Sequence, residues 1–92
     1  KDYDYKSLAY RFSGRKMEPF LITVPPKEEK DMNLVSHSGQ EFIHVMEGRL
    51  EIRVGGEALA LEPGDSLYFD SQNPHALRGL DGKEAKFLDV IL

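Results

Sequence analysis

Residues 49–65 decide the fold, and they read RLEIRVGGEALALEPGD. The first part alternates apolar and charged side chains, with Ile52 between Glu51 and Arg53. This period of two is typical of a half-buried β-strand, so we expect the apolar set to face the core and the charged pair to face water. The glycines at 55–56 suit a two-residue hairpin turn, and a second alternating run follows them. The stretch therefore predicts a β-hairpin.

Short runs of the same kind occupy the remainder of the chain. The further strands that we expect lie at residues 20–24, 32–36, 41–46, 57–61, 66–69, 75–78 and 84–92. Turn residues separate them, and no segment carries an apolar stripe of helical period and length. This pattern predicts an all-β sandwich or barrel. We expect one domain over residues 1–92, in which an N-terminal arm (1–16) precedes the barrel (17–92).

Composition excludes several classes of protein. The 92 residues carry a formal net charge of −4, which argues against broad nucleic-acid binding by this domain. The chain contains no cysteine, so disulfides and thiolate metal sites are excluded. Its apolar runs are far too short for a membrane span, and we expect no membrane contact and a cytoplasmic location.

Two segments differ from the barrel in character. The arm is basic, because residues 1–16 hold five Lys or Arg against two Asp, and it is rich in aromatic side chains such as Tyr3 and Tyr5. We expect these rings to pack over a sheet edge, with a lid over a ligand as the alternative. The charged run at 27–31 is expected to be a solvated loop.

Three polar residues fall on inward positions of the predicted strands. Counting in twos from His37 reaches Glu41 and then Ile43 and Val45, so the polar pair shares the interior face with apolar residues. His75 opens a later strand. Two imidazoles and one carboxylate that converge in a barrel form a facial triad, which suits divalent iron and also zinc, manganese or nickel.

A metal-free pocket is the alternative interpretation of the same residues. A buried carboxylate needs a partner, and His37 and His75 would then hydrogen-bond to Glu41 and to a ligand. In both cases we expect apolar walls to shape the binding site. The predicted ligand-binding residues are Ile43, Val45, Ile52, Phe69 and Leu77.

Two motifs resemble those of the cupin family. Residues 37–48, HSGQEFIHVMEG, are similar to the first cupin motif, and residues 61–69, LEPGDSLYF, followed by Pro74-His75, are similar to the second. The resemblance implies a jelly-roll barrel, also called a double-stranded β-helix. Val35 stands where the family usually has a further His, and Gly79 where it often has Asn, so one of four usual ligands is missing.

The first motif is most similar to that of C-terminal cupin domains in helix-turn-helix regulators of the XRE type. The resemblance implies a small-molecule sensor without turnover, a homodimer, and a DNA-binding domain elsewhere in the parent chain. The alternative is a small metal-dependent enzyme of the dioxygenase or isomerase type. We assign no catalytic residue.

Overall fold

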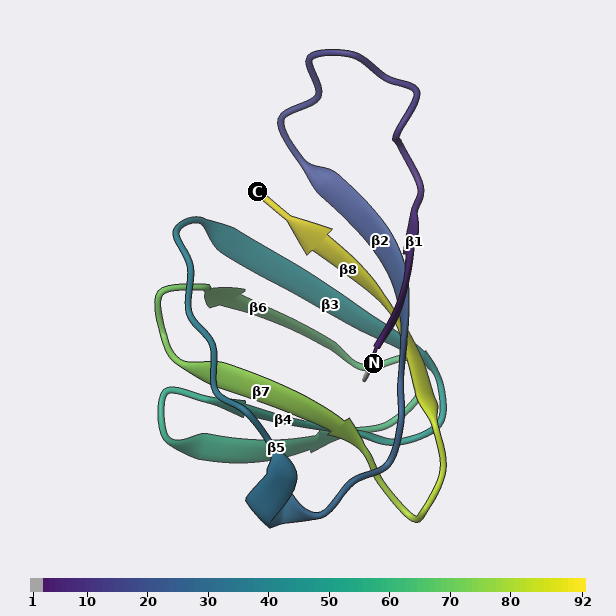
Figure 1. Ribbon diagram of the computed structural model, residues 1–92, viewed down its shortest axis with the longest axis vertical. Coiled ribbons are helices and arrows are strands. Elements are labelled where there is room, and N and C mark those ends of the chain that lie inside the picture. Colours follow the sequence, from purple (N-terminus) through teal and green to yellow (C-terminus); the bar gives the residue numbers. More distant parts are fainter. Residues whose placement is uncertain (1–2) are drawn as a thin grey trace.

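Two antiparallel sheets lie against each other in the computed structural model, which describes residues 3–92 (Figure 1). Lys1 and Asp2, counted in the basic arm, lie outside the described residues. The strands within that range are β1 (Asp4–Ser7), β2 (Glu18–Val24), β3 (Gln40–Glu47), β4 (Leu50–Val54), β5 (Glu57–Leu61), β6 (Ser66–Asp70), β7 (His75–Gly79) and β8 (Ala85–Ile91). The larger sheet has the order β1-β2-β8-β3-β6 and the smaller one β5-β4-β7. The predicted all-β class is confirmed.

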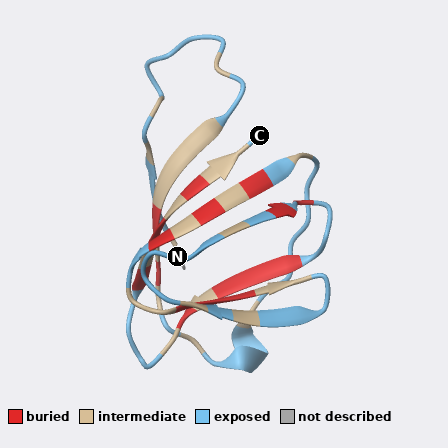
Figure 2. Ribbon diagram, turned by 180° about the vertical axis from the view of Figure 1, so that it is seen from behind, coloured by how far each residue is buried: buried red, intermediate tan, exposed pale blue. Residues whose placement is uncertain are grey.

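The core lies between the two sheets. Side chains of β3 alternate between buried and partly exposed, which Figure 2 shows as alternating bands. β8 pairs with β2 on one side and β3 on the other, so its inward residue Phe87 is fully buried. The buried apolar cluster consists of Ile22, Val24, Ile43, Val45, Leu50, Ile52, Phe69, Leu77, Ala85 and Phe87.

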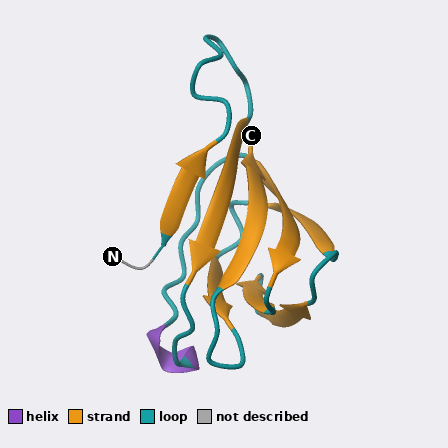
Figure 3. Cartoon of the chain, turned by 90° about the vertical axis from the view of Figure 1, so that its right-hand side faces the viewer, coloured by secondary structure: helices purple, strands orange, loops and turns teal. Residues whose placement is uncertain are grey.

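Most of the predicted strands are present, but the one expected at 32–36 is not. This segment follows a single 3-10 turn, η1 (Glu29–Asp31), and runs beside β7. Within it only Val35 forms a β-bridge, exchanging two backbone hydrogen bonds of 2.9 Å with His75. The prediction was wrong because the apolar residues here lie in a connection that joins β2 to β3 of the larger sheet and passes the smaller sheet with only isolated bridges. Figure 3 shows these connections as loops, together with the long β1–β2 loop that projects beyond the strands.

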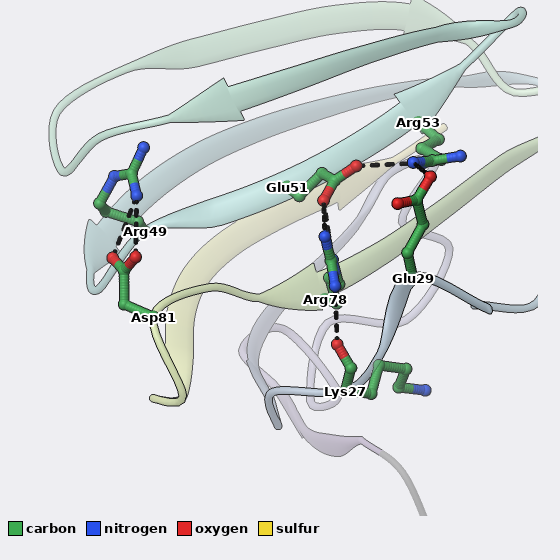
Figure 4. A network of polar contacts seen from close by, with 7 residues as sticks. All are labelled: Lys27, Glu29, Arg49, Glu51, Arg53, Arg78 and Asp81. Atoms are coloured by element: carbon green, nitrogen blue, oxygen red, sulfur yellow. Dashed lines mark hydrogen bonds and ion pairs between the residues drawn. The ribbon is translucent and has the colours of Figure 1, made fainter. Parts of the chain in front are cut away.

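Glu51 corrects a second expectation, because its side chain does not face water. It is only 7% exposed, although it lies on the outer side of β4. Arg78 donates to one carboxylate oxygen (Nε–Oε1 2.7 Å) and Arg53 to the other (Nε–Oε2 3.0 Å), as Figure 4 shows. The loop at 27–31 covers this group: Glu29 pairs with Arg53, and Arg78 also donates to the carbonyl of Lys27 at 2.9 Å. The charged loop therefore packs on the smaller sheet through ion pairs.

These contacts also set the acidity of Glu51. Burial alone would raise its pKa, but the hydrogen bonds and charges of Arg78 and Arg53 outweigh it, and the pKa lies below its ordinary value. A carboxyl group whose pKa is lowered by folding adds stability above its unfolded pKa, and that stability is lost as pH falls through the folded pKa.

We expect Arg78→Met to lower the free energy of unfolding at pH 7 by about 2 kcal/mol, because it leaves a buried carboxylate with one partner fewer. Methionine retains the apolar stem of the side chain, so the loss reports on charge. The difference from the unsubstituted protein should shrink in acid, as Glu51 takes up a proton. Urea unfolding at several pH values measures both effects.

The matched control is Arg49→Met. Arg49 also binds two acids, Glu62 at 2.8 Å and Asp81 at 3.1 Å, but on the surface. Exposed ion pairs contribute little, so a loss as large as that of Arg78→Met would contradict the role given to burial.

Candidate metal centre

A cavity of about 460 Å³ opens between the sheets on the side of β2, β7 and β8. Its apolar lining comes from Ile22, Val35, Ala76, Leu77 and Ile91. Its polar lining comes from Tyr3, Tyr5, Lys27, Asn33, His37, Glu41, His75 and Asp89. The cavity thus brings together the segment 27–37 and residues from several strands.

His37 and Glu41 meet at the wall of this cavity. Nε2 of His37 lies 3.4 Å from Oε1 of Glu41, and the carboxylate is 4% exposed whereas the imidazole is 39% exposed. Gly39 permits this approach: it has φ +100°, and a Cβ there would lie 2.0 Å from the carbonyl oxygen of Leu92. A side chain at position 39 would displace the end of β8.

His75 reaches the same carboxylate oxygen from the opposite sheet. Its Nε2 lies 3.6 Å from Oε1 of Glu41, and the ring is buried against the edge of Phe69, with centroids 5.0 Å apart. Nδ1 donates to the carbonyl of Asn73 at 2.7 Å. Nδ1 of His37 likewise donates to the carbonyl of Ser38 at 3.2 Å. Since a carbonyl can only accept, Nδ1 carries a proton in both imidazoles, and Nε2, directed at Glu41, is the ring atom that a metal ion would bind.

This donor set fits a divalent metal ion. One ligand atom from each of His37, Glu41 and His75 lies within 4.8 Å of the others. Ligands bound at about 2.1 Å on one face of an octahedron stand about 3 Å apart, and the two distances from Glu41 to the imidazoles, 3.4 Å and 3.6 Å, are close to this value. Tethering of the far ring nitrogen is the usual support of a histidine ligand. Val35, at the place of the missing histidine, lines the cavity with an apolar side chain.

Asp89 is a residue of this site that the sequence analysis missed. It is 3% exposed, lines the cavity, and shares the inward face of β8 with Phe87. Burial raises its pKa to about 9, helped by the hydrogen bond to Glu41 and by the charge of Glu41. A carboxyl residue at an inward position within an apolar strand was the available signal, since such a group is costly to bury.

The predicted apolar walls lie in two places. Leu77 lines the cavity. Ile43, Val45, Ile52 and Phe69 point inward as expected, but they belong to the buried cluster and are not part of the cavity lining. Parity along a strand determines the face of a side chain, whereas its depth in the barrel depends on the pairing of all strands.

The aromatic arm divides into two parts. β1 pairs with β2 and forms the edge of the larger sheet, and here Tyr5 and the preceding Tyr3 line the cavity. Tyr3 donates to the carbonyl of Leu77 at 3.3 Å, which ties the arm to β7. Tyr10 and Phe12 lie in the projecting β1–β2 loop and are exposed. The pairing of β1 with β2 agrees with the packing role expected for the arm, and the lid over a ligand stays a prediction.

Comparison with known proteins agrees with this architecture. A family model described as cupin domain matches residues 20–91. A search of curated proteins found no match. No helix in the described part of the chain is long and apolar enough to cross a membrane.

Solved structures of two kinds resemble the chain. Hydroxypropylphosphonic acid epoxidase from S. wedmorenis has a TM-score of 0.89 and 26% identity over 100% of this chain and 51% of that chain. Fe(II)-HppE with the alternative substrate (S)-1-HPP has a TM-score of 0.88 and 26% identity over 99% of this chain and 50% of that chain. The Cupin_2 domain of an XRE family transcriptional regulator from Enterobacter cloacae has a TM-score of 0.84 and 24% identity over 99% of this chain and 96% of that chain. The chain thus spans about half the length of the epoxidase structures.

We expect the metal-free protein to lose stability as pH rises from about 4 to about 9 because of Asp89. Its folded pKa of about 9 lies above the unfolded value of about 4, so the folded state binds the extra proton in this window. The slope from one such group cannot exceed about 1.4 kcal/mol per pH unit. Asp89→Asn should remove most of this slope in urea unfolding with chelator present. An unchanged slope would contradict the assignment.

Proposed function

The chain belongs to the cupin family, and from this premise we propose that it binds a divalent metal ion at His37, Glu41 and His75 and a small molecule in the adjoining cavity. We further propose that it serves as the ligand sensor of a longer regulatory protein. The observation that carries the metal site is the convergence of two Nε2 atoms on one buried carboxylate while both Nδ1 atoms donate to carbonyls.

The donor set limits the choice of metal. Two imidazoles and a carboxylate suit iron, manganese, nickel or zinc, and three protein ligands leave coordination positions free. When bound, such an ion would hold and polarise an oxygen or nitrogen atom of the ligand. Val35 lines the cavity with an apolar side chain that cannot coordinate the ion, so the coordination position on that side is free for a ligand.

The cavity supports the second half of the proposal. A volume of about 460 Å³ lies within the range of small-molecule sites. Its wall combines apolar residues such as Ile22 and Leu77 with a few polar groups. In this combination the apolar residues determine shape and the polar groups determine orientation.

Similarity to the regulator domain supports the use as a sensor, since the two chains cover each other almost completely. In this proposal another domain of the parent protein contacts DNA, the cupin domain pairs with a second copy, and the protein acts in the cytoplasm. Signalling then requires that the ligand bind the two states of the regulator with different affinity.

A metal-dependent enzyme is the second candidate. The 26% identity to Fe(II)-HppE, over nearly the whole of this chain, favours it. The two uses differ in turnover. A sensor returns its ligand unchanged, whereas an enzyme converts it when dioxygen and the Fe(II)-loaded protein are present.

The test of the metal site is titration with Co(II) or Fe(II) by calorimetry, together with metal analysis of protein purified without an affinity tag. We expect one ion per chain, and a loss of at least about 100-fold in affinity in His75→Ala, because a ligand contributes more than the groups that orient it. His44→Ala is the matched control: His44 also lies on a strand but bonds to Ser66 (Nδ1–Oγ 2.7 Å), outside the cavity lining. Metal binding that survives in His75→Ala, or is lost equally in His44→Ala, would overturn the assignment.

A further inference from the structure

Asp89 is a buried acid at the cavity that the metal site does not use. It lines the cavity and is 3% exposed, yet it is not among the three residues whose ligand atoms converge. Within residues 3–92, no donor forms a hydrogen bond to its Oδ1. A buried acceptor without a donor is costly, so its persistence at the wall of a cavity points to a donor from outside the chain.

Several neighbouring polar groups are engaged elsewhere, and Tyr5, whose pKa is raised by burial and by the charge of Asp89, lines the same cavity without bonding Oδ1 of Asp89. Asp89 contacts Glu41, whose carboxylate also accepts from Ser71 (Oγ–Oε1 3.4 Å) and faces both imidazoles. The Nδ1 atoms of the histidines donate to carbonyls, and the hydroxyl of Tyr3 donates to Leu77. When Glu41 binds a metal ion, Asp89 lies beside that ion in the lining of the cavity. None of these groups donates a hydrogen bond to Oδ1 of Asp89.

We propose that Asp89 is the specificity-determining acceptor of the cavity and receives a hydrogen bond from a hydroxyl or amino group of the ligand. This inference rests on the proposed metal and ligand site. Asp89 adjoins the metal ligand Glu41, so the donor must stand close to the metal-bound atom. The fitting class is therefore a small carboxylic acid with a hydroxyl or amino group on the carbon beside the carboxylate, which offers the metal an oxygen and Asp89 a donor.

The alternative is that an apolar group of the ligand lies against Asp89, and the structure disfavours it. A site built around a buried acceptor rejects a ligand that lacks the donor, because the acceptor then stays unpaired. Leaving a buried acceptor unpaired forfeits its full desolvation penalty, so discrimination of about 10- to 100-fold is expected.

The experiment compares glycolate, glycine and propionate, which differ only in a terminal hydroxyl, ammonium or methyl group. Each acid is titrated into the Co(II)-loaded protein, and the visible spectrum of the metal reports binding. Chelation alone favours the first two, so the informative quantity is the ratio of their affinity to that of propionate in each variant. We expect Asp89→Leu to reduce this ratio at least about tenfold. Asp89→Asn, which retains an acceptor oxygen, should preserve more of this ratio than Asp89→Leu does.

Ser71→Ala is the matched control, because it removes a contact of Glu41 but is not part of the cavity lining. We expect the ratio to persist in it. An equal fall of the affinity ratio in Ser71→Ala would assign the effect to Glu41 and overturn the proposal. An unchanged ratio in Asp89→Leu would also overturn it, as would failure of all three acids to bind the Co(II)-loaded protein. Failure of Co(II) itself to bind would instead refute the proposed metal site. Thermal melts of each variant confirm folding, and Asp89→Ala, which also removes the acceptor, replaces Asp89→Leu if the latter does not fold.

Discussion

The carboxylate of Glu41 is the group on which the arrangement of the cavity depends. It is buried between two sheets whose inward residues are mostly apolar, and an ionised carboxyl group in such surroundings is stable only with partners. The fold supplies them from three directions: His37 from the segment before β3, His75 from the smaller sheet, and Asp89 from β8. Two of these partners are imidazoles whose Nε2 atoms point at the carboxylate, and the third is itself an acid. None of the three supplies a fixed positive charge, so the site is arranged to receive a cation.

The elements around Glu41 are held with unequal strength. β8 lies between β2 and β3 and is bonded along its length on both sides. The segment from 25 to 39 has no such ladder. It is attached through isolated bridges at Pro26 and Val35 and through the ion pairs of the 27–31 loop. Burial of Glu51 beneath that loop is therefore part of how the cavity wall is built, although Glu51 lies on the outer side of its sheet and far along the chain from His37.

Much of this architecture could be predicted from local pattern. Alternation with a period of two correctly separated Phe69 from Tyr68 and placed Glu41 on the face of Ile43, because parity is a property of a single strand. The burial of Glu51 escaped prediction, since it arises from a loop that folds back over the outer face of β4. Asp89 escaped for a related reason: its position beside Glu41 follows from the register of β3 against β8, in which Glu41 lies opposite Ile91 and Ile43 opposite Asp89. Contacts between strands distant in sequence depend on that register, which no single segment encodes.

One part of the cavity wall has continuous strand pairing and another part does not, and this difference relates the metal site to the proposed sensing role. His37 belongs to the loosely held segment, whereas Glu41 and His75 belong to strands with continuous pairing. An ion bound by all three would join the segment to both sheets, and a ligand on the open positions of that ion would contact Val35 and Asn33 of the same segment. Binding would thus stabilise a segment that lacks a continuous strand ladder, where opening costs less free energy than in the paired strands. A signal carried by the order of this segment needs no rearrangement of the barrel. It requires only that the ordered and the loosened segment present different surfaces to a neighbouring domain.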